Sequence, residues 1–484
     1  MPSTRNFTAA IIDRLTADWS TTIASGNREL RQSLKVLRAR ARNLAQNNDY
    51  ARKFLHLVRN NVVGPRGLAL QMRVARADGS RDDAANRAIE QAWAEWGKRG
   101  ACTACGTMSW SDAQRLFMTS VARDGEVLVR LIRGFPNDYG FALEFIEADH
   151  LDEELNVERG VAAPGIARAL ANEIRMGVER DTWGRPVAYY LLTVHPGDDA
   201  VARAGRVYRR VPAAEIIHGF MPDDRVGAAR GLPWMHAAMT RLNMIGGYEE
   251  AELVAARVGA AKMGFYKTRE GASYSMPGEK DAAGNIVRDA SPGHFEMLPA
   301  EIEDVVTFDP EHPTAQYRDF IKGVLRGAAS GLGVSYNSLA NDLEGVNFSS
   351  IRHGVLEDRD EWRTIQDWLA GALHQRVFEA WLDVALLSGA LPLPASDFER
   401  LNAANWQPRG WQWVDPEKEV AAHERAIALS VRTRADIAAE QGRDLEDIFR
   451  QLAAERDLAS ALGIELTAAA APQRRPEPTE TMES

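Results

Sequence analysis

Three pairs of neighbouring acids come closest to a catalytic pattern in this sequence. They are Asp149 with Asp152, Glu357 with Asp358, and Asp360 with Glu361. Paired carboxylates can hold two divalent metal ions, so such acids could serve a metal-dependent nuclease. Neighbouring carboxylates on a helix point in different directions, however, and a solvent-exposed face explains them more simply. A nuclease is therefore kept only as an alternative.

The two cysteines, Cys102 and Cys105, form a single Cys-x-x-Cys motif. Such a motif can be a redox pair or half of a zinc site. A structural zinc site needs four ligands, and the sequence has no second Cys-x-x-Cys and no histidine pair at zinc spacing. We therefore expect two unpaired thiols in a loop.

Motifs of common enzyme classes do not occur in the sequence. It has no Gly-x4-Gly-Lys-Ser/Thr phosphate loop and no Gly-x-Ser-x-Gly nucleophile elbow. His423-Glu424 is not followed by a second histidine at the spacing of a zinc protease. We expect no catalytic residues, no metal ligands, no cofactor and no enzymatic activity.

The formal net charge of the 484 residues is −10, and it is unevenly spread. About +7 lies on residues 1–60 and about −6 on residues 415–484. Net acidity argues against a sequence-specific DNA-binding protein, because such proteins gain affinity from Lys and Arg on phosphates. The basic segment has helical spacing, with Leu30, Leu34, Leu37 and Leu44 on one face and Arg31, Lys35, Arg38 and Arg42 on another. These cations are either solvated or contact DNA or an acidic neighbour.

The bulk composition is that of a globular protein, with 45% hydrophobic residues. No apolar run reaches the roughly 18–20 residues that span a bilayer, and the N-terminus lacks the pattern of a secretory signal. We expect no membrane contact and a protein that stays in the cytoplasm or in an assembly formed there.

The type of secondary structure that the sequence predicts changes along the chain. Residues 61–232 predict a mixture of helix and strand, with a helix at 82–96 and strands at 126–133, 141–145 and 188–195. Pro233 to about Ala261 predicts one long helix of about 40–45 Å. Residues 263–312, rich in Gly, Pro, Asp and Ser, predict a protrusion with short strands.

The second half predicts mainly helices. A helix at 314–330 precedes a polar loop at 338–349, and a proline-free helix follows at 350–387. Its apolar stripe is Ile351, Val355, Trp362, Ile365, Leu369, Leu373, Val377 and Trp381, which favours core packing over base stacking for the two tryptophans. Later helix starts are predicted at Asp415-Pro416, Thr433 and Asp444.

From about residue 35 to 465 the chain resembles the lambda-type portal proteins of tailed bacteriophages. The resemblance rests on the order and spacing of several stretches: Glu147 to Asp152, Gly177 to Asp181, Gly184 to Pro186, His195 to Gly197, Arg225 to Trp234, Tyr248 to Leu253, Leu332 to Tyr336, Asn341-Asp342, Val346 to Arg352, Asp415 to Glu419 and Gly442 to Asp444. Phe348 stands where the family usually has tyrosine, which keeps an aromatic side chain.

The resemblance implies an α+β, multi-region, ring-forming portal fold. Its parts are an α/β wing, a helical stem, a small β-containing clip and a helical crown. In chain order they would be an N-terminal arm (1–34), a mixed α/β wing (35–232), a stem helix (233–262), a clip (263–312), a return helix with tunnel loop and long wing helix (313–390), crown helices (391–467) and a disordered tail (468–484).

The resemblance also implies a function and partners. The protein would be a ring, usually a dodecamer, at one capsid vertex, through which double-stranded DNA is packaged and ejected without sequence recognition. It would dock the terminase large subunit and then the head–tail adaptor, and contact the major capsid protein or scaffold. It would reside in the virion, after assembly in the host cytoplasm. The alternative is another head–tail structural or adaptor protein.

Two sets of site residues follow from the resemblance. The tunnel loop would face DNA with Asn341, Asp342, Glu344, Asn347, Ser349 and Arg352. The clip would face the terminase and the adaptor with Lys267, Arg269, Lys280 and Arg288. Within the loop we expect Arg352 to pair with Asp342 or Glu344 rather than with a phosphate. A dodecamer would carry about −120 formal charges, which suits a conduit that DNA must slide through.

Overall fold

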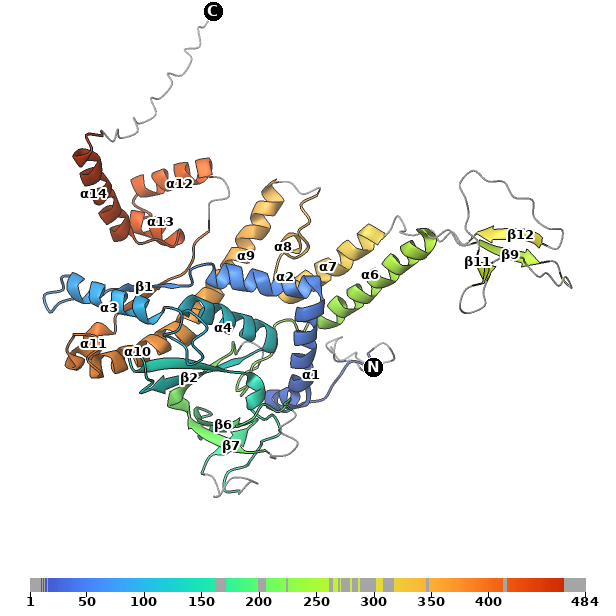
Figure 1. Ribbon diagram of the computed structural model, residues 1–484, viewed down its shortest axis with the longest axis horizontal. Coiled ribbons are helices and arrows are strands. Elements are labelled where there is room, and N and C mark those ends of the chain that lie inside the picture. Colours follow the sequence, from blue (N-terminus) through green and yellow to red (C-terminus); the bar gives the residue numbers. More distant parts are fainter. Residues whose placement is uncertain are drawn as a thin grey trace, which may run out of the picture. The chain divides into compact units, whose positions relative to one another are not determined.

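The computed structural model describes residues 10, 12, 14, 16–161, 171–198, 206–222, 225–260, 264–268, 270, 279–280, 286–287, 302–307, 317–344, 348–411 and 416–464 (Figure 1). The chain divides into two compact units. The larger unit contains residues 1–35, 55–233 and 346–484, and the smaller unit contains residues 36–54 and 234–345. Helices α1 (Gly26–Asn47) and α2 (Asp49–Val58) have residues in both.

The described residues of the larger unit form three antiparallel sheets. One has the order β3-β2-β8, with β2 at Val127–Arg133, β3 at Phe141–Ile146 and β8 at Ile216–Gly219. The second has the order β4-β5-β6-β7, at Glu173–Arg175, Val178–Arg180, Pro186–Leu192 and Tyr208–Pro212. The third pairs β1 (Ala69–Met72) with β13 (Ala404–Gln407). The predicted strands at 126–133, 141–145 and 188–195 are confirmed within a few residues.

Buried side chains from the first two sheets share one apolar cluster. Its members are Leu128, Ile146, Leu151, Val178, Tyr189, Leu191, Val211 and Ile216. Short 3-10 turns at Ala148–His150 and Ala213–Glu215 adjoin the strands. The region is thus one packed α+β body, as expected from its alternating apolar pattern.

The helices of the larger unit begin where capping side chains predict. Asp82 caps α3 (Asp83–Trp96), and a Ser109–Asp112 capping box begins α4 (Trp110–Asp124). Thr433 caps α13 (Arg434–Glu440) and Asp444 caps α14 (Leu445–Ala461), both as predicted. Further helical segments of the larger unit are η2 (Arg59–Val63), η6 (Ala395–Asp397), α11 (Phe398–Leu401) and α12 (Pro416–Ala428).

The long helix predicted at 350–387 is present but not uniform. It runs as α9 (Phe348–Leu369), a π-helical segment (Ala370–Gln375) and α10 (Arg376–Leu387). Trp362 is 4% exposed and Trp381 is fully buried, so their assignment to the core is confirmed. The Trp381 ring lies 5.1 Å from that of Trp93 and 5.8 Å from that of Phe378.

The basic face predicted on α1 does not form one solvated surface. Leu30, Leu34 and Leu44 are buried as predicted, but Arg38 is also buried, with 1% of its surface exposed. Arg38 is four residues after Leu34, so it falls on the same helical stripe.

A buried ion pair lies within the larger unit. Arg230 donates from Nε to both carboxylate oxygens of Glu126, at 2.8 and 2.9 Å. His218 Nε2 lies 2.8 Å from Glu126 Oε2, and the Gly231 N–H also donates to that oxygen. A Cβ on Gly231 would lie 2.1 Å from the Gly125 carbonyl oxygen. Only glycine therefore fits this contact between residues 106 positions apart.

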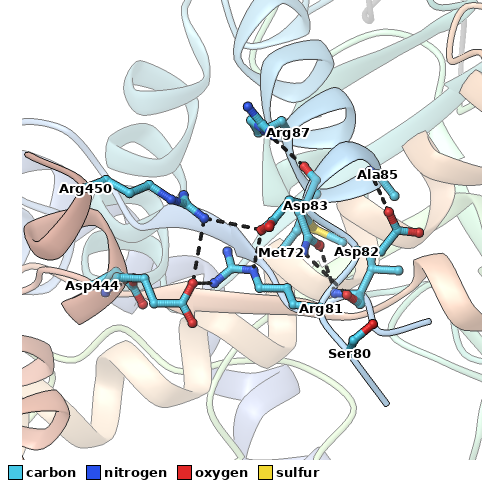
Figure 2. A network of polar contacts seen from close by, with 12 residues as sticks. Met72, Ser80, Arg81, Asp82, Asp83, Ala85, Arg87, Asp444 and Arg450 are labelled. Carbon is cyan, nitrogen blue, oxygen red and sulfur yellow. Dashed lines mark hydrogen bonds and ion pairs between the residues drawn. The ribbon is translucent and has the colours of Figure 1, made fainter. Parts of the chain in front are cut away.

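Ion pairs connect helix α14 to the start of α3 (Figure 2). Arg81 pairs with Glu446, and Arg450 lies 3.3 Å from Asp83. Ala459 is the one buried residue of α14, while Phe449 and Leu458 are more than half exposed. Exposed ion pairs contribute little to stability, so α14 is held weakly within one copy of the chain.

The smaller unit consists of helices and a β-ribbon. Its helices are α6 (Met239–Ala260), α7 (Tyr317–Leu332) and α8 (Tyr336–Ala340). Strand β9 (Gly264–Thr268) pairs antiparallel with β12 (Ile302–Thr307), and β10 (Glu279–Lys280) pairs with β11 (Ile286–Val287). The strand content predicted for 263–312 is confirmed in its described part.

Helix α6 begins later than the sequence predicted. Pro233 was expected in its first turn, but the helix starts at Met239. The N–H groups of Ala238 and Met239 both donate to the Met235 carbonyl, so a separate turn precedes the helix. No helix in the described part of the chain is both long and apolar enough to cross a membrane. The tail at 468–484 lies outside the described residues.

Candidate functional site: the loop after helix α8

Local capping positions the loop at 341–344. Ser335 caps α8 by accepting a hydrogen bond from the Ser338 N–H at 3.4 Å. The helix ends after five residues because Asn341 adopts left-handed backbone angles, with φ of +53°. Asparagine tolerates this conformation better than most residues, so its place at the turn is explained by the backbone.

Asp342 is the most firmly held side chain of the loop. Lys322 Nζ lies 2.9 Å from Asp342 Oδ2, and the Tyr336 hydroxyl donates to the same oxygen at 2.8 Å. The Glu344 N–H donates to Oδ1 at 3.0 Å. The hydrogen bond from Lys322, followed by that from Tyr336, lowers the pKa of Asp342 to about 2. Burial and then the bond to Asp342 raise the pKa of Tyr336 to about 12. The aspartate is therefore charged at any physiological pH.

The two neighbouring loop side chains also contact cations. Lys53 of α2 donates to Asn341 Oδ1 at 2.7 Å, and Arg318 of α7 pairs with Glu344. All three cation-binding contacts lie within the smaller unit. Asn341, Asp342 and Glu344 thus each contact a cation from a helix of the smaller unit.

Sequence reasoning missed the cations. The loop itself contains none, and Lys53, Arg318 and Lys322 were not assigned to the site. Arg318 and Lys322 are four residues apart on a predicted helix, so they fall on one face, which was a usable signal. The distance of 288 residues between Lys53 and Asn341 left no comparable signal.

The remaining loop residues are placed only in part. Asn347 lies outside the described residues, and Ser349 lies in α9. The expected pairing of Arg352 with Asp342 or Glu344 is wrong, because those acids take their cations from α7 while Arg352 lies 3.8 Å from Glu419 of α12.

The four proposed clip residues are also placed in part. Lys267 lies in β9 and its ammonium is 3.5 Å from Glu303 of β12. Lys280 lies in β10. Arg269 and Arg288 lie outside the described residues.

Contacts among the helices of the smaller unit hold the site in place. The Tyr50 hydroxyl donates to Glu249 Oε1 at 3.0 Å, and the Asn48 amide donates to the Leu242 carbonyl at 3.0 Å. Burial, together with the charge of Glu249, raises the pKa of Tyr50. These bonds tie the start of α2, which carries Lys53, to α6.

Acids proposed as alternatives for metal chemistry are engaged elsewhere. Asp152 binds Arg206 Nη1 at 2.7 Å and the Tyr208 hydroxyl at 2.5 Å. Asp360 binds Arg363 at 2.7 Å. Among the described residues, Glu147, Asp149 and His195 have ligand atoms within 4.8 Å of one another and could share one ion. His195 Nε2 lies 3.2 Å from Glu147 Oε2, so an ordinary histidine–carboxylate contact also explains that group.

The two cysteines differ sharply in environment. Cys102 is fully buried, and burial raises its pKa to about 12. Cys105 is exposed, and a hydrogen bond with Thr107 lowers its pKa below the ordinary value. Neither forms a disulfide, in agreement with the prediction of unpaired thiols.

At neutral pH, iodoacetamide should therefore modify Cys105 and spare Cys102 in the folded protein, since the thiolate is the reacting form. Peptide mass spectrometry after limited labelling measures the two sites separately. Cys105→Ser should abolish labelling of the folded protein, and urea should make Cys102 reactive. Equal labelling of both thiols without urea would contradict the burial of Cys102.

Comparison with known proteins places the chain in a family. The family model described as "Phage portal protein, lambda family" matches residues 13–366. The "Probable portal protein" of Halomonas phage phiHAP-1 is 37% identical over 467 residues, which are 95% of this chain and 88% of the relative. "Portal protein B" of Escherichia phage lambda is 23% identical over 477 residues, covering 90% and 85% of the two chains. A solved chain from the neck of an empty GTA particle has a TM-score of 0.48 and 13% identity, covering 88% and 97%.

Proposed function

Because this chain belongs to the lambda family of phage portal proteins, we propose that it forms a ring-shaped channel at one capsid vertex for double-stranded DNA. The family match over residues 13–366 carries this proposal, and it confirms the resemblance found in the sequence. As a portal protein the chain is a structural component of a phage-like particle. DNA would enter through the channel during packaging and leave through it at ejection.

The geometry of the loop at 341–344 supports a conduit. Asp342 and Glu344 are each neutralised by a cation from α7, so the loop presents little net charge. A wall of this kind would neither repel phosphates strongly nor hold them, which sliding requires. The formal charge of −10 per chain also opposes tight, non-specific adhesion to DNA.

Helix α14, which would belong to the crown, supports assembly into a ring. Its exposed Phe449, Leu452 and Leu458 and its single buried residue leave it without a core in one copy. A helix of 17 residues gains most of its stability from packing, and a neighbouring subunit would supply it. Cyclic assembly through one repeated interface, usually with twelve copies, would close the ring.

Each region of the chain would contact a different partner, assigned from the order of regions in the family. The clip at 263–312 would dock the terminase large subunit during packaging and the head–tail adaptor afterwards. The wing would face the major capsid protein or scaffold, and the crown would point into the capsid. The described acids offer no observation that favours a nuclease over this structural role.

An in vitro packaging reaction tests the proposal. Procapsids assembled with this protein should protect DNA from DNase when the terminase and ATP are added. Procapsids assembled without it should protect none. Equal protection in both preparations would exclude the channel function.

Reversing the loop charges should slow DNA passage. In Asp342→Lys or Glu344→Lys, the new cation repels its former partner on α7, so the wall gains free positive charge that holds phosphates. The packaging rate, followed as DNase-protected DNA against time, should fall while rings remain intact. Asp319→Lys makes the same charge change on α7 and serves as control. Unchanged packaging in the loop variants would show that the loop does not face DNA.

A further inference from the structure

Three cations from two helices converge on the loop at 341–344. They are Lys53 of α2 and Arg318 and Lys322 of α7. Each is bound to a different oxygen-bearing side chain of the loop, and none of these contacts involves the other unit.

We propose that Lys53, Arg318 and Lys322 form a binding site for DNA backbone phosphates, which the loop's own oxygens occupy as internal substitutes. The inference rests on the proposed channel function. Carboxylate and phosphate oxygens offer Lys and Arg the same kind of charge-assisted hydrogen bond. A passing phosphate can therefore exchange with a loop carboxylate, and the loop takes the cation back when the phosphate moves on. DNA is contacted at each step without a lasting gain in ion pairs.

The contacts differ in strength, which gives an order of exchange. The side chains of Arg318 and Glu344 are 58% and 70% exposed, so this pair is screened and weak. The side chains of Lys322 and Asp342 are only 23% and 18% exposed, and Tyr336 binds the same carboxylate. Arg318 should therefore exchange first, whereas Lys322 stays with Asp342 unless that acid is removed.

Removing the charge of Glu344 should release Arg318 to bind DNA phosphates. Assembled rings of full-length protein are titrated against a fluorescent, random-sequence DNA duplex at several salt concentrations. Rings of the Glu344→Gln variant should bind the duplex more tightly than rings of the parent, and their affinity should fall more steeply with salt concentration. The ratio of affinities between about 50 and 200 mM salt should grow by about 3.5-fold for each freed cation that reaches a phosphate.

Asp319→Asn is the matched control. Asp319 is an exposed acid on α7, and within the described residues it has no ion-pair partner, so its loss changes the net charge without freeing a cation. The proposal predicts a clear difference between Glu344→Gln and Asp319→Asn. If the two variants bind DNA alike, only net charge matters and the proposal is overturned.

A double-mutant comparison tests whether Glu344 binds Arg318 in the absence of DNA. Arg318→Gln should change DNA affinity little in the parent and should cancel the whole gain in the Glu344→Gln background. An equal loss in both backgrounds would show that Arg318 is already free, which contradicts the proposal.

Ring formation by negative-stain imaging is recorded for every variant, so two failures can be told apart. If the parent forms no rings and supports no packaging, the channel function fails and this inference with it. The other outcome is that rings form and package DNA while Glu344→Gln binds DNA no more tightly than Asp319→Asn. In that case only the proposed phosphate site at Lys53, Arg318 and Lys322 is wrong.

Discussion

Arg230→Met should lower the free energy of unfolding of the larger unit by about 3–5 kcal/mol, the usual cost of breaking a buried ion pair. Arg230 is 1% exposed and uses its guanidinium donors fully. Besides Glu126 it binds the carbonyls of Leu151 and Met176 from Nη1, at 3.1 and 3.0 Å, and that of Ala148 from Nη2, at 3.0 Å. Methionine would leave a buried carboxylate and three carbonyls without these donors.

The midpoint of urea unfolding, followed by tryptophan fluorescence, measures the loss. Arg31→Met is the control, because Arg31 and Glu154 form a pair at 2.6 Å whose side chains are about half exposed. That pair should contribute at most about 1 kcal/mol. Adding Glu126→Gln to Arg230→Met should restore part of the stability, since no buried charge then remains unpaired. A loss no larger than that of Arg31→Met would contradict the assigned role.

Trp381→Ala should cost a similar amount, about 3–5 kcal/mol, because it empties a large volume in a rigid aromatic cluster. Trp381 is fully buried, and its ring lies 5.1 Å from Trp93, 5.8 Å from Phe378 and 5.9 Å from Tyr139. Loss of near-ultraviolet circular dichroism and a lower urea midpoint would report the loosened cluster.

Phenylalanine substitutions separate packing from hydrogen bonding in this cluster. Trp96 Nε1 donates to the Phe141 carbonyl at 2.9 Å, whereas within the described chain Trp381 Nε1 has no acceptor. Trp381→Phe should therefore destabilise less than Trp96→Phe, which also removes the buried hydrogen bond from the indole N–H to the Phe141 carbonyl. The reverse order would show that the indole N–H of Trp381 is bonded.

Local signals in the sequence predicted much of the secondary structure. The helix at 82–96, the helix start at Thr433 and the stripe through Trp362 and Trp381 depend on residues within a few turns, and the structure confirms them. The π-helical segment at 370–375 was missed because it interrupts a helix without proline or a change of polarity.

Contacts between distant residues could not be predicted in the same way. Glu126 and Arg230 are 104 residues apart, and Arg352 meets Glu419 rather than a nearby acid. Such pairs are set by how sheets and helices pack, which periodicity does not encode. The loop assignment came from family order alone, and the cations that hold the loop emerged only from the structure.

The most direct test of the account is a class-averaged top view of the purified full-length protein by electron microscopy. We expect closed rings with rotational symmetry and a central hole wide enough to admit a DNA duplex. A particle that stays monomeric at every salt concentration, or an oligomer without an axial opening, would contradict the claim that copies of this chain enclose a DNA channel.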